Sequence, residues 1–378
     1  MAEYRFEDIA INSTEKKKPV ESDKEHYLGL EHLDSGTFKV SRFGSEVAPI
    51  GDKLIMKKGD VLFGKRRAYQ KKVAIAPFDG IFSAHGMVLR PKEDVIDKNF
   101  FPLFIASDYF LDAAIKISVG SLSPTINWRD LKELKFNLPT IEEQKKLAET
   151  LWQIVATMES YKKLLAKTDE MVKAKFIEMF GTIENPKWKV DNLGNVTSIA
   201  RGGSPRPISE YITESENGLN WIKIGDAKNG RYITQTEEKI KPEGLKKTRQ
   251  VFAGDLLLSN SMSFGRPYIL KIDGCIHDGW LVIHFEKDLF NAIYLQAYFG
   301  LSSTYSLFES MAAGGVVNNL NSEIVKKLPV IIPSLELQNQ FAEFVEKSEE
   351  SKSTIQASID SLTKVYKKII TENLGGNN

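Results

Sequence analysis

Two kinds of hydrophobic pattern alternate along this chain. Short runs of β-branched and aromatic residues, bounded by Gly, Asn, Asp or Pro, predict strands within 53–64, 71–91, 231–235, 255–260, 267–274 and 280–286. Longer segments after Pro139 and Pro333 carry an apolar residue at every third or fourth position, which predicts long helices. The pattern therefore predicts an α+β fold in which sheet-rich parts alternate with helices.

Residues that favour the start of a helix follow both prolines. Thr140 and Glu143 have the spacing of a capping box, and Ser334 takes the place of Thr140 in the second segment. Apolar residues at 4-3 spacing then form a heptad seam along each helix. The first seam comprises Leu147, Leu151, Ile154, Met158, Tyr161, Leu165, Thr168, Val172, Lys175 and Met179, and the second comprises Phe341, Val345, Ser348, Lys352, Ile355, Ile359, Leu362, Tyr366, Ile369 and Asn373.

The two seams can bury each other if the helices pair as a coiled coil. Because the sheet-rich part between Gly181 and Pro333 has to return the chain, we expect the pairing to be antiparallel. That arrangement would place two sheet-rich domains at opposite ends of a rod, related by a pseudo-two-fold axis. Ser348 and Lys352 make the N-terminal half of the second seam polar, which predicts weaker pairing there.

An internal repeat accounts for this alternation. Similar residues recur 194 positions apart around the start of each helix: Ile126 and Leu320, Pro139 and Pro333, Gln144 and Gln338, Leu147 and Phe341. The Gly-Asp pairs at 59–60 and 254–255 match within the sheet-rich parts. The sequence therefore predicts two copies of one unit of about 190 residues.

Composition limits the classes of protein that this chain can be. It has 378 residues, 42% of them hydrophobic, which suits two or three domains with ordinary cores and excludes a chain that is disordered throughout. Lys and Arg number 51 against 50 Asp and Glu, so the net charge is +1. A polybasic coat is therefore excluded, and any contact with nucleic acid has to come from local patches.

Other features bear on cellular location. The single cysteine, Cys275, excludes disulfide frameworks and thiolate zinc sites and suits a reducing compartment, so the cytoplasm is the expected location. Charges at Glu3, Arg5, Glu7 and Asp8 do not fit a signal peptide. No run approaches the roughly 18 apolar residues of a membrane span.

The sequence shows no catalytic fingerprint. It lacks the nucleotide-binding, metalloprotease and serine-hydrolase signatures, and its five histidines match no metal-ligand spacing. We therefore expect no catalytic and no metal-binding residues in this chain. We expect Cys275 to be a small buried hydrophobic residue.

Basic residues gather in turns, and two of these turns follow the Gly-Asp strands of the two copies. Arg and Lys mixed with Tyr, Asn and Ser can neutralise phosphates and read base edges. The candidate nucleic-acid-binding residues are Lys65, Arg66, Arg67, Tyr69, Lys71, Lys72, Arg201, Ser204, Arg206, Asn260, Ser261 and Arg266. Equivalent turns with different polar side chains suit two modules that perform one task on different sequences.

Three motifs occur once per copy and in the same order. They are KGDVLFG and AGDLLLS, the Gly-rich segments SVGSLSPTIN and AAGGVVNNLN, and the helix starts LPTIEEQ and IPSLELQ. With a long helix after each copy, this pattern resembles the specificity subunit of type I restriction-modification systems over nearly the whole chain. The resemblance implies target-recognition domains at 1–139 and 182–333, a central spacer helix at 140–181 and a distal spacer helix at 334–378.

The resemblance also implies a function, partners and cofactors. Each domain would read one half of a bipartite, gapped site in double-stranded DNA, and the helices would set the spacing and dock two methylation subunits. Restriction subunits would join the same complex, and no membrane would be involved. The chain itself would be non-catalytic and hold no cofactor, because in that family S-adenosylmethionine, ATP and Mg²⁺ belong to the partner subunits.

Two other interpretations stay open on the residues alone. The heptad helices also fit a coiled-coil protein-interaction scaffold without DNA specificity, which would show no DNA affinity even with its partners added. A hydrolytic enzyme with a dispersed site would need a deep pocket with perturbed titratable groups in one globular part.

Overall fold

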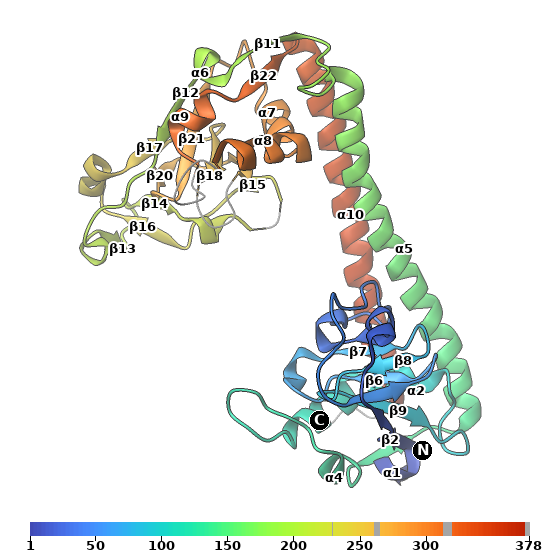
Figure 1. Ribbon diagram of the computed structural model, residues 1–378. Coiled ribbons are helices and arrows are strands. Elements are labelled where there is room, and N and C mark those ends of the chain that lie inside the picture. The colour runs from blue at the N-terminus through green and yellow to red at the C-terminus, as the bar shows by residue number, and fades with distance from the viewer. Residues whose placement is uncertain (229, 261–264, 313–319, 375–378) are drawn as a thin grey trace. The chain divides into compact units, whose positions relative to one another are not determined.

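The computed structural model describes the whole chain except residues 229, 261–264, 313–319 and 375–378 (Figure 1). The chain forms two compact units, which we call unit 1 (1–162 with 356–378) and unit 2 (163–355). Helix α5 spans Ile141–Phe180 and helix α10 spans Leu335–Leu374. Each long helix therefore contributes residues to both units.

Unit 1 contains two four-stranded sheets, with strand orders β2-β9-β6-β7 and β3-β5-β8-β4, and a ribbon of β1 with β10. The strands are β1 Ala2–Arg5, β2 Ala10–Ser13, β3 Lys16–Lys17, β4 Tyr27–Leu28, β5 Lys53–Met56, β6 Val61–Phe63, β7 Val73–Ile75, β8 Gly80–Phe82, β9 Met87–Pro91 and β10 Lys135–Leu138. The short helices are α1 Phe6–Ile9, α2 Phe100–Ile105, α3 Asp108–Lys116 and α4 Trp128–Leu131.

Unit 2 contains two five-stranded sheets, with strand orders β12-β21-β18-β19-β15 and β13-β16-β14-β20-β17, and a ribbon of β11 with β22. The strands are β11 Lys189–Asn192, β12 Thr197–Arg201, β13 Ile212–Thr213, β14 Leu219–Ile222, β15 Tyr232–Ile233, β16 Glu238–Ile240, β17 Arg249–Val251, β18 Leu256–Ser259, β19 Pro267–Leu270, β20 Gly274–Ile276, β21 Trp280–Phe285 and β22 Pro329–Ile332. The short helices are α6 Leu193–Val196, α7 Ala292–Phe299, α8 Ser302–Ala312 and α9 Ser322–Lys326.

Corresponding parts of the two units are built alike. β4 lies parallel to β8 in unit 1, and β14 lies parallel to β20 in unit 2. The Ile126 amide donates to the carbonyl oxygen of Lys65 at 2.9 Å, and the Leu320 amide donates to that of Asn260 at 3.2 Å. The repeat predicted from the sequence is therefore a repeat of three-dimensional structure, and the mixed sheet and helix content confirms the α+β class.

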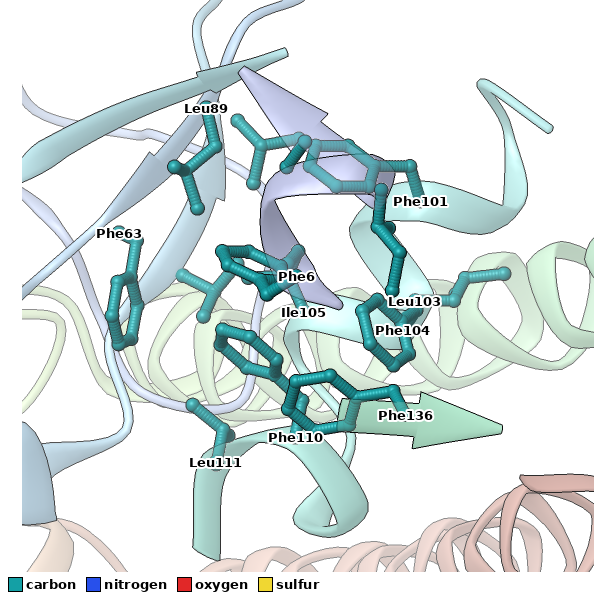
Figure 2. Close-up of a cluster of buried hydrophobic side chains, with 14 of the residues drawn as sticks. Phe6, Phe63, Leu89, Phe101, Leu103, Phe104, Ile105, Phe110, Leu111 and Phe136 are labelled. Atoms are coloured by element: carbon teal, nitrogen blue, oxygen red, sulfur yellow. The ribbon is translucent and has the colours of Figure 1, made fainter. Parts of the chain in front are cut away.

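Aromatic rings fill the core of unit 1 (Figure 2). The ring of Phe136 in β10 lies 5.2 Å from that of Phe104 in α2 and 5.5 Å from that of Phe110 in α3, measured between centroids. Leu151 of α5 and Leu374 of α10 belong to the same buried cluster. Burial of this core therefore also holds one end of each long helix in unit 1.

Helices α5 and α10 run antiparallel within unit 2. The rings of Phe176 and Phe180 in α5 lie 5.4 and 5.5 Å from that of Phe341 in α10. Further along the pair, the ammonium of Lys352 lies 2.7 Å from a carboxylate oxygen of Asp169. Residue numbers thus fall along α10 as they rise along α5, which confirms the predicted antiparallel pairing.

The seams predicted from heptad spacing lie on the inner faces of the two helices. All twenty seam positions are buried or half-buried. Of the two polar positions in the N-terminal half of the second seam, Lys352 forms the ion pair with Asp169, and the buried Ser348 hydroxyl donates to the Phe344 carbonyl oxygen of its own helix at 2.8 Å. Both of these polar groups therefore have partners.

Candidate nucleic-acid interface

The Gly-Asp turns that precede the candidate loops have the same construction in both units. Each glycine has a positive φ, 92° in unit 1 and 101° in unit 2, which a side chain would disfavour. Each aspartate accepts a hydrogen bond at 2.8 Å from the backbone N–H three residues before it. Arg90 then holds Asp60 through two contacts of 2.7 and 2.9 Å, and His284 Nδ1 lies 3.0 Å from Asp255. The turns therefore fix where strands β6 and β18 begin.

In unit 1, strand β6 leads into a loop over 64–72 whose backbone conformation is unusual. Arg67 and Lys71 have left-handed φ values of 53° and 48° on either side of the short 3-10 turn Ala68–Gln70. Such non-glycine residues persist where surrounding contacts hold them. Here Ala68 is buried, and the Arg67 amide donates to the carbonyl oxygen of Pro124 at 2.8 Å. The side chains that this loop exposes are Arg66, Arg67 and Tyr69.

Two of the predicted basic residues in this loop are held by other parts of unit 1. The Lys71 ammonium lies 2.7 Å from Asp108 and 2.8 Å from Asp112, both in α3. The Lys72 ammonium donates to the Leu30 carbonyl oxygen at 2.7 Å. Lys71 and Lys72 therefore differ from the exposed residues of the loop, because their ammonium groups already have partners within unit 1.

Two lysines that sequence reasoning missed join the predicted Lys65 and Arg66. Lys16 of β3 and Lys65 line one cavity of about 280 Å³, whose lining, all of it among the described residues, contains no carboxylate. Burial lowers the pKa of Lys65, and repulsion from Lys16 lowers it further. Burial also lowers the pKa of His85, with further lowering by Arg66, Lys65 and Lys53. We call Lys16, Lys53, Lys65 and Arg66 the basic patch.

Strand pairing explains why the sequence did not reveal the whole patch. Lys16 is far from Lys65 in the chain and lies in no motif, but β3 pairs antiparallel with β5, which places Lys16 opposite Leu54, a residue that lines the same cavity. Alternating polar positions in the β5 run were the only available signal, and they do not specify a partner strand.

In unit 2, residues from separate predicted clusters meet at Asp278. Its backbone carbonyl oxygen accepts hydrogen bonds from Arg201 Nε and from Asn260 Nδ2, both at 3.0 Å. Its carboxylate accepts from the Ser204 hydroxyl at 2.8 Å, and the Arg206 guanidinium lies 3.9 Å away. Sequence reasoning did not select Asp278, because one acidic residue in a turn does not stand out in a chain that contains 50 Asp and Glu residues.

The Asp278 carboxylate is ionised and organised by its neighbours. Burial alone would raise its pKa, but the hydrogen bond from Ser204 and the charges of His277 and Arg201 together lower the pKa below its ordinary value of 3.8. His277 Nε2 lies 2.8 Å from the carboxylate, and the Gly279 amide donates to His277 Nδ1 at 3.0 Å. We call Arg201, Ser204, Arg206, Asn260, His277 and Asp278 the Asp278 cluster.

An open cavity of about 730 Å³ lies beside the Asp278 cluster. Its lining includes Ser204, Arg206, Trp221, Lys223, Glu238 and His277. Donors, an acceptor and an aromatic edge thus face one concave surface, which is the set of groups that contacts to phosphates and base edges require.

The remaining predicted residues lie near the end of β18. Asn260 is buried, and its backbone N–H donates to the Gly279 carbonyl oxygen at 2.9 Å. Arg266 is exposed immediately before β19, and its amide donates to the Ser259 hydroxyl at 3.0 Å. Ser261 lies outside the described residues. Within each unit most of the predicted residues therefore lie near one another, although the Asn260 side chain is buried.

Three further observations concern metal ligands, the cysteine and the long helices. No group of three or more His, Cys, Asp or Glu side chains there is placed to hold a metal ion. Cys275 is buried as expected, and burial raises the pKa of its thiol to about 11. Among the described helices, none is long and apolar enough to cross a membrane.

Comparison with known families identifies the family of this chain. The family model for the type I restriction modification DNA specificity domain matches residues 5–168 and 185–364, once in each copy of the repeat. The chain belongs to this family. Its specificity subunits recognise DNA and are generally non-catalytic.

Individual members of the specificity family resemble this chain over different lengths. The MjaX specificity subunit of Methanocaldococcus jannaschii is 26% identical over 346 residues, which cover 84% of this chain and 78% of that protein. The EcoDI specificity subunit of Escherichia coli is 26% identical over 194 residues, covering 50% of this chain and 43% of the relative. The StySPI specificity subunit of Salmonella potsdam is 23% identical over 350 residues, covering 85% and 72%.

Solved structures share the fold. A chain from the assembly of a type I restriction-modification system is 19% identical, with a TM-score of 0.61 over 99% of this chain and 97% of that chain. The type I specificity subunit from M. genitalium is 13% identical, with a TM-score of 0.54 over 100% and 96%. At these identities the likeness concerns the fold alone.

Proposed function

We propose that the two units each read one half of a bipartite, gapped site in double-stranded DNA. The observation that carries this proposal is the pair of equivalent Gly-Asp strands, which have the same backbone construction but end in different polar side chains, Lys65 in unit 1 and Asn260 in unit 2. The same backbone with different side chains at equivalent positions is suited to reading two half-sites of different base sequence.

The two units would contact DNA by different chemistry. The basic patch of unit 1 and the exposed Arg67 offer cations, and the cavity that Lys16 and Lys65 line contains no carboxylate, which favours phosphates. The Asp278 cluster of unit 2 pairs its cations with an acceptor, and carboxylates can accept from cytosine or adenine amino groups while arginines bind guanine. We therefore propose that unit 2 makes the more acceptor-dependent contacts.

The chain would serve a complex that supplies the chemistry. We propose that two methylation subunits, with S-adenosylmethionine, and restriction subunits, with ATP and Mg²⁺, assemble on it, while this chain holds no cofactor. Action on chromosomal DNA would place the complex in the cytoplasm. Leu164 and Met171, two turns apart on α5 and each 48% exposed, supply an apolar face for a methylation subunit.

The first experiment tests recognition directly. The full chain is co-expressed with a type I methylation subunit in a host without adenine methylation, and methyladenine is mapped across the genome by long-read sequencing. A gapped two-part motif with methyladenine on both strands is the expected result. A complex that forms but modifies no defined motif would refute the proposal and favour the scaffold interpretation.

A second experiment tests the basic patch within the same complex. Lys65→Gln with Arg66→Gln should weaken binding to all sequences and reduce the slope of log affinity against log salt by about 1 for each lost phosphate contact. Lys145→Gln with Lys167→Gln removes two exposed α5 cations that pair with Glu142 and Glu170 and serves as the matched control. An unchanged salt slope in the patch variant would exclude phosphate contacts by these residues.

A further inference from the structure

A buried glutamine joins helix α5 to the globular part of unit 1. Gln144 is 1% exposed in the first turns of α5. Its Oε1 accepts a hydrogen bond from the Asp97 amide at 2.8 Å, and its Nε2 donates to the carbonyl oxygens of Val95 at 3.2 Å and Pro139 at 2.9 Å. One side chain thus connects the helix to its own entry residue and to a separate segment of the domain.

The same joint occurs in unit 2. Gln338 is fully buried in the first turns of α10. Its Oε1 accepts from the Asn291 amide at 2.9 Å, and its Nε2 donates to the carbonyl oxygens of Leu289 and Pro333, both at 3.0 Å. Every partner lies 194 positions after its counterpart in unit 1, and the side chains differ at two of the three positions, where Leu289 replaces Val95 and Asn291 replaces Asp97. The backbone contacts therefore persist through changes of the surrounding residues.

The segments held by these glutamines lead directly into core helices. Residues 95–97 precede α2, whose six residues are all buried, and residues 289–291 precede α7, which carries the buried Tyr294 and Tyr298. Each glutamine is therefore a direct polar link between a long helix and the core of its unit.

Glutamine has the donors and the acceptor that this place requires. Both N–H groups and the carbonyl oxygen of the side chain are used, and all three partners are backbone groups. A leucine would leave three backbone groups without these bonds, and a glutamate could not donate to the two carbonyl oxygens. The nearby apolar contacts of Ala148 and Leu151 bury surface, but apolar contacts are not directional and orient the helix less strictly than hydrogen bonds do.

We infer that Gln144 and Gln338 are positioning residues that fix the orientation of each DNA-reading unit on its long helix, and that discrimination between DNA spacer lengths depends on them. This inference rests on the proposed function, because it concerns the distance between two half-sites. The glutamines touch no DNA in this scheme. They act by holding the domain and the helix as one body, so that the spacing set by the helices is transmitted to the reading surfaces.

The experiment uses the complex with methylation subunits and variants Gln144→Leu and Gln338→Leu. Matched controls are Gln153→Leu on α5 and Gln340→Leu on α10, which replace exposed glutamines of the same helices. One readout is hydrogen exchange at the amides of Asp97 and Asn291, which donate to the two glutamines. The other is methylation of DNA targets with the native spacer and with spacers one base pair shorter or longer.

We expect each buried-glutamine variant to exchange the amide at its own joint faster. We also expect it to lose about tenfold in preference for the native spacer, which corresponds to a net loss of about one hydrogen bond. Preference for the bases within each half-site should stay unchanged, and the controls should behave as the unmodified chain. Gln144→Asn keeps all three polar groups on a shorter arm and replaces Gln144→Leu if that variant does not fold, with the same expected direction.

Two outcomes would count against different claims. Faster exchange at the joint with an unchanged spacer preference would overturn the positioning role, as would unchanged exchange in a folded variant. A failure of the unmodified complex to show any spacer preference would instead refute the proposed bipartite reading.

Discussion

Removal of the Asp278 carboxylate should weaken recognition by unit 2 alone. In the structure this carboxylate accepts from the Ser204 hydroxyl and faces His277 Nε2, both at 2.8 Å, and it lies 3.9 Å from the Arg206 guanidinium. Asp278→Ala leaves the backbone carbonyl in place, so the contacts from Arg201 and Asn260 remain. The variant therefore releases Ser204, His277 and Arg206 and keeps the rest of the cluster.

The expected magnitude follows from these contacts. A hydrogen bond to a charged group contributes about 1.5–3 kcal/mol when buried. The Asp278 side chain is 34% exposed, so solvent screening reduces each of the two short contacts to about 0.5–1 kcal/mol. The contact between Arg206 and the carboxylate, at 3.9 Å, adds little to this free energy. These contacts hold Ser204, His277 and Arg206 in place within unit 2, so their sum of about 1–2 kcal/mol sets the upper end of the effect, a loss of up to roughly 5-fold to 30-fold in preference for the cognate half-site.

The assay is competitive methylation by the assembled complex on targets that carry single-base changes in one half-site or the other. Asp278→Ala should lower discrimination at the half-site read by unit 2 and leave the other half-site unchanged. Asp278→Asn, which can still accept one hydrogen bond, should give a smaller loss. Full discrimination by Asp278→Ala, or equal losses at both half-sites, would refute the assignment of this cluster to specific recognition.

Substitutions at three further positions test the packing and the electrostatics. Phe136→Ala should lower the free energy of unfolding of unit 1 by about 3–5 kcal/mol, because it empties the centre of the aromatic core. Phe136→Leu should lower the same free energy by less. Urea denaturation measures both values, and equal losses of stability would contradict this view of the core. Ser348→Ala should leave the free energy of unfolding unchanged or raise it by up to about 1 kcal/mol, because the Ser348 hydroxyl donates to a carbonyl oxygen of its own helix. A marked fall in that free energy would reveal a role of the hydroxyl between the helices. The hydrogen bond from Lys71, with that from Lys367, holds the pKa of Asp108 below its ordinary value of 3.8, so its stabilising effect is present above that value and is lost as the pH falls through the lower, folded pKa. Unfolding measured between pH 6 and pH 2 should therefore depend less on pH in Asp108→Asn, and an identical pH profile would contradict the ion-pair assignment.

Much of the architecture was predictable because it rests on local and periodic signals. The heptad spacing identified the helix faces that become buried, and the Pro, Thr and Glu residues at 139–143 marked the start of α5. In the structure Thr140 and Glu143 do form the reciprocal capping contacts, with the Thr140 amide donating to Glu143 at 2.9 Å. The repeat could be recognised because its motifs follow one another at a constant offset.

The candidate site was predictable only in part, because contacts distant in the chain decide which side chains are available. The run at 65–72 looks uniformly basic, yet Lys71 is neutralised by Asp108 and Asp112 of α3 while Arg67 stays exposed. Conversely, Lys16 enters the patch through strand pairing that no short motif records.

The sequence by itself determined the repeat, the antiparallel helices and the place of the loops, because periodicity, capping and turn residues act over a few positions each. The tertiary structure alone decided that Asp278 binds side chains from two separate segments, that Lys65 shares a cavity with Lys16, and that one glutamine joins each helix to its domain. These features depend on hydrogen bonds and burial between residues tens of positions apart, and such contacts exist only once the chain has folded.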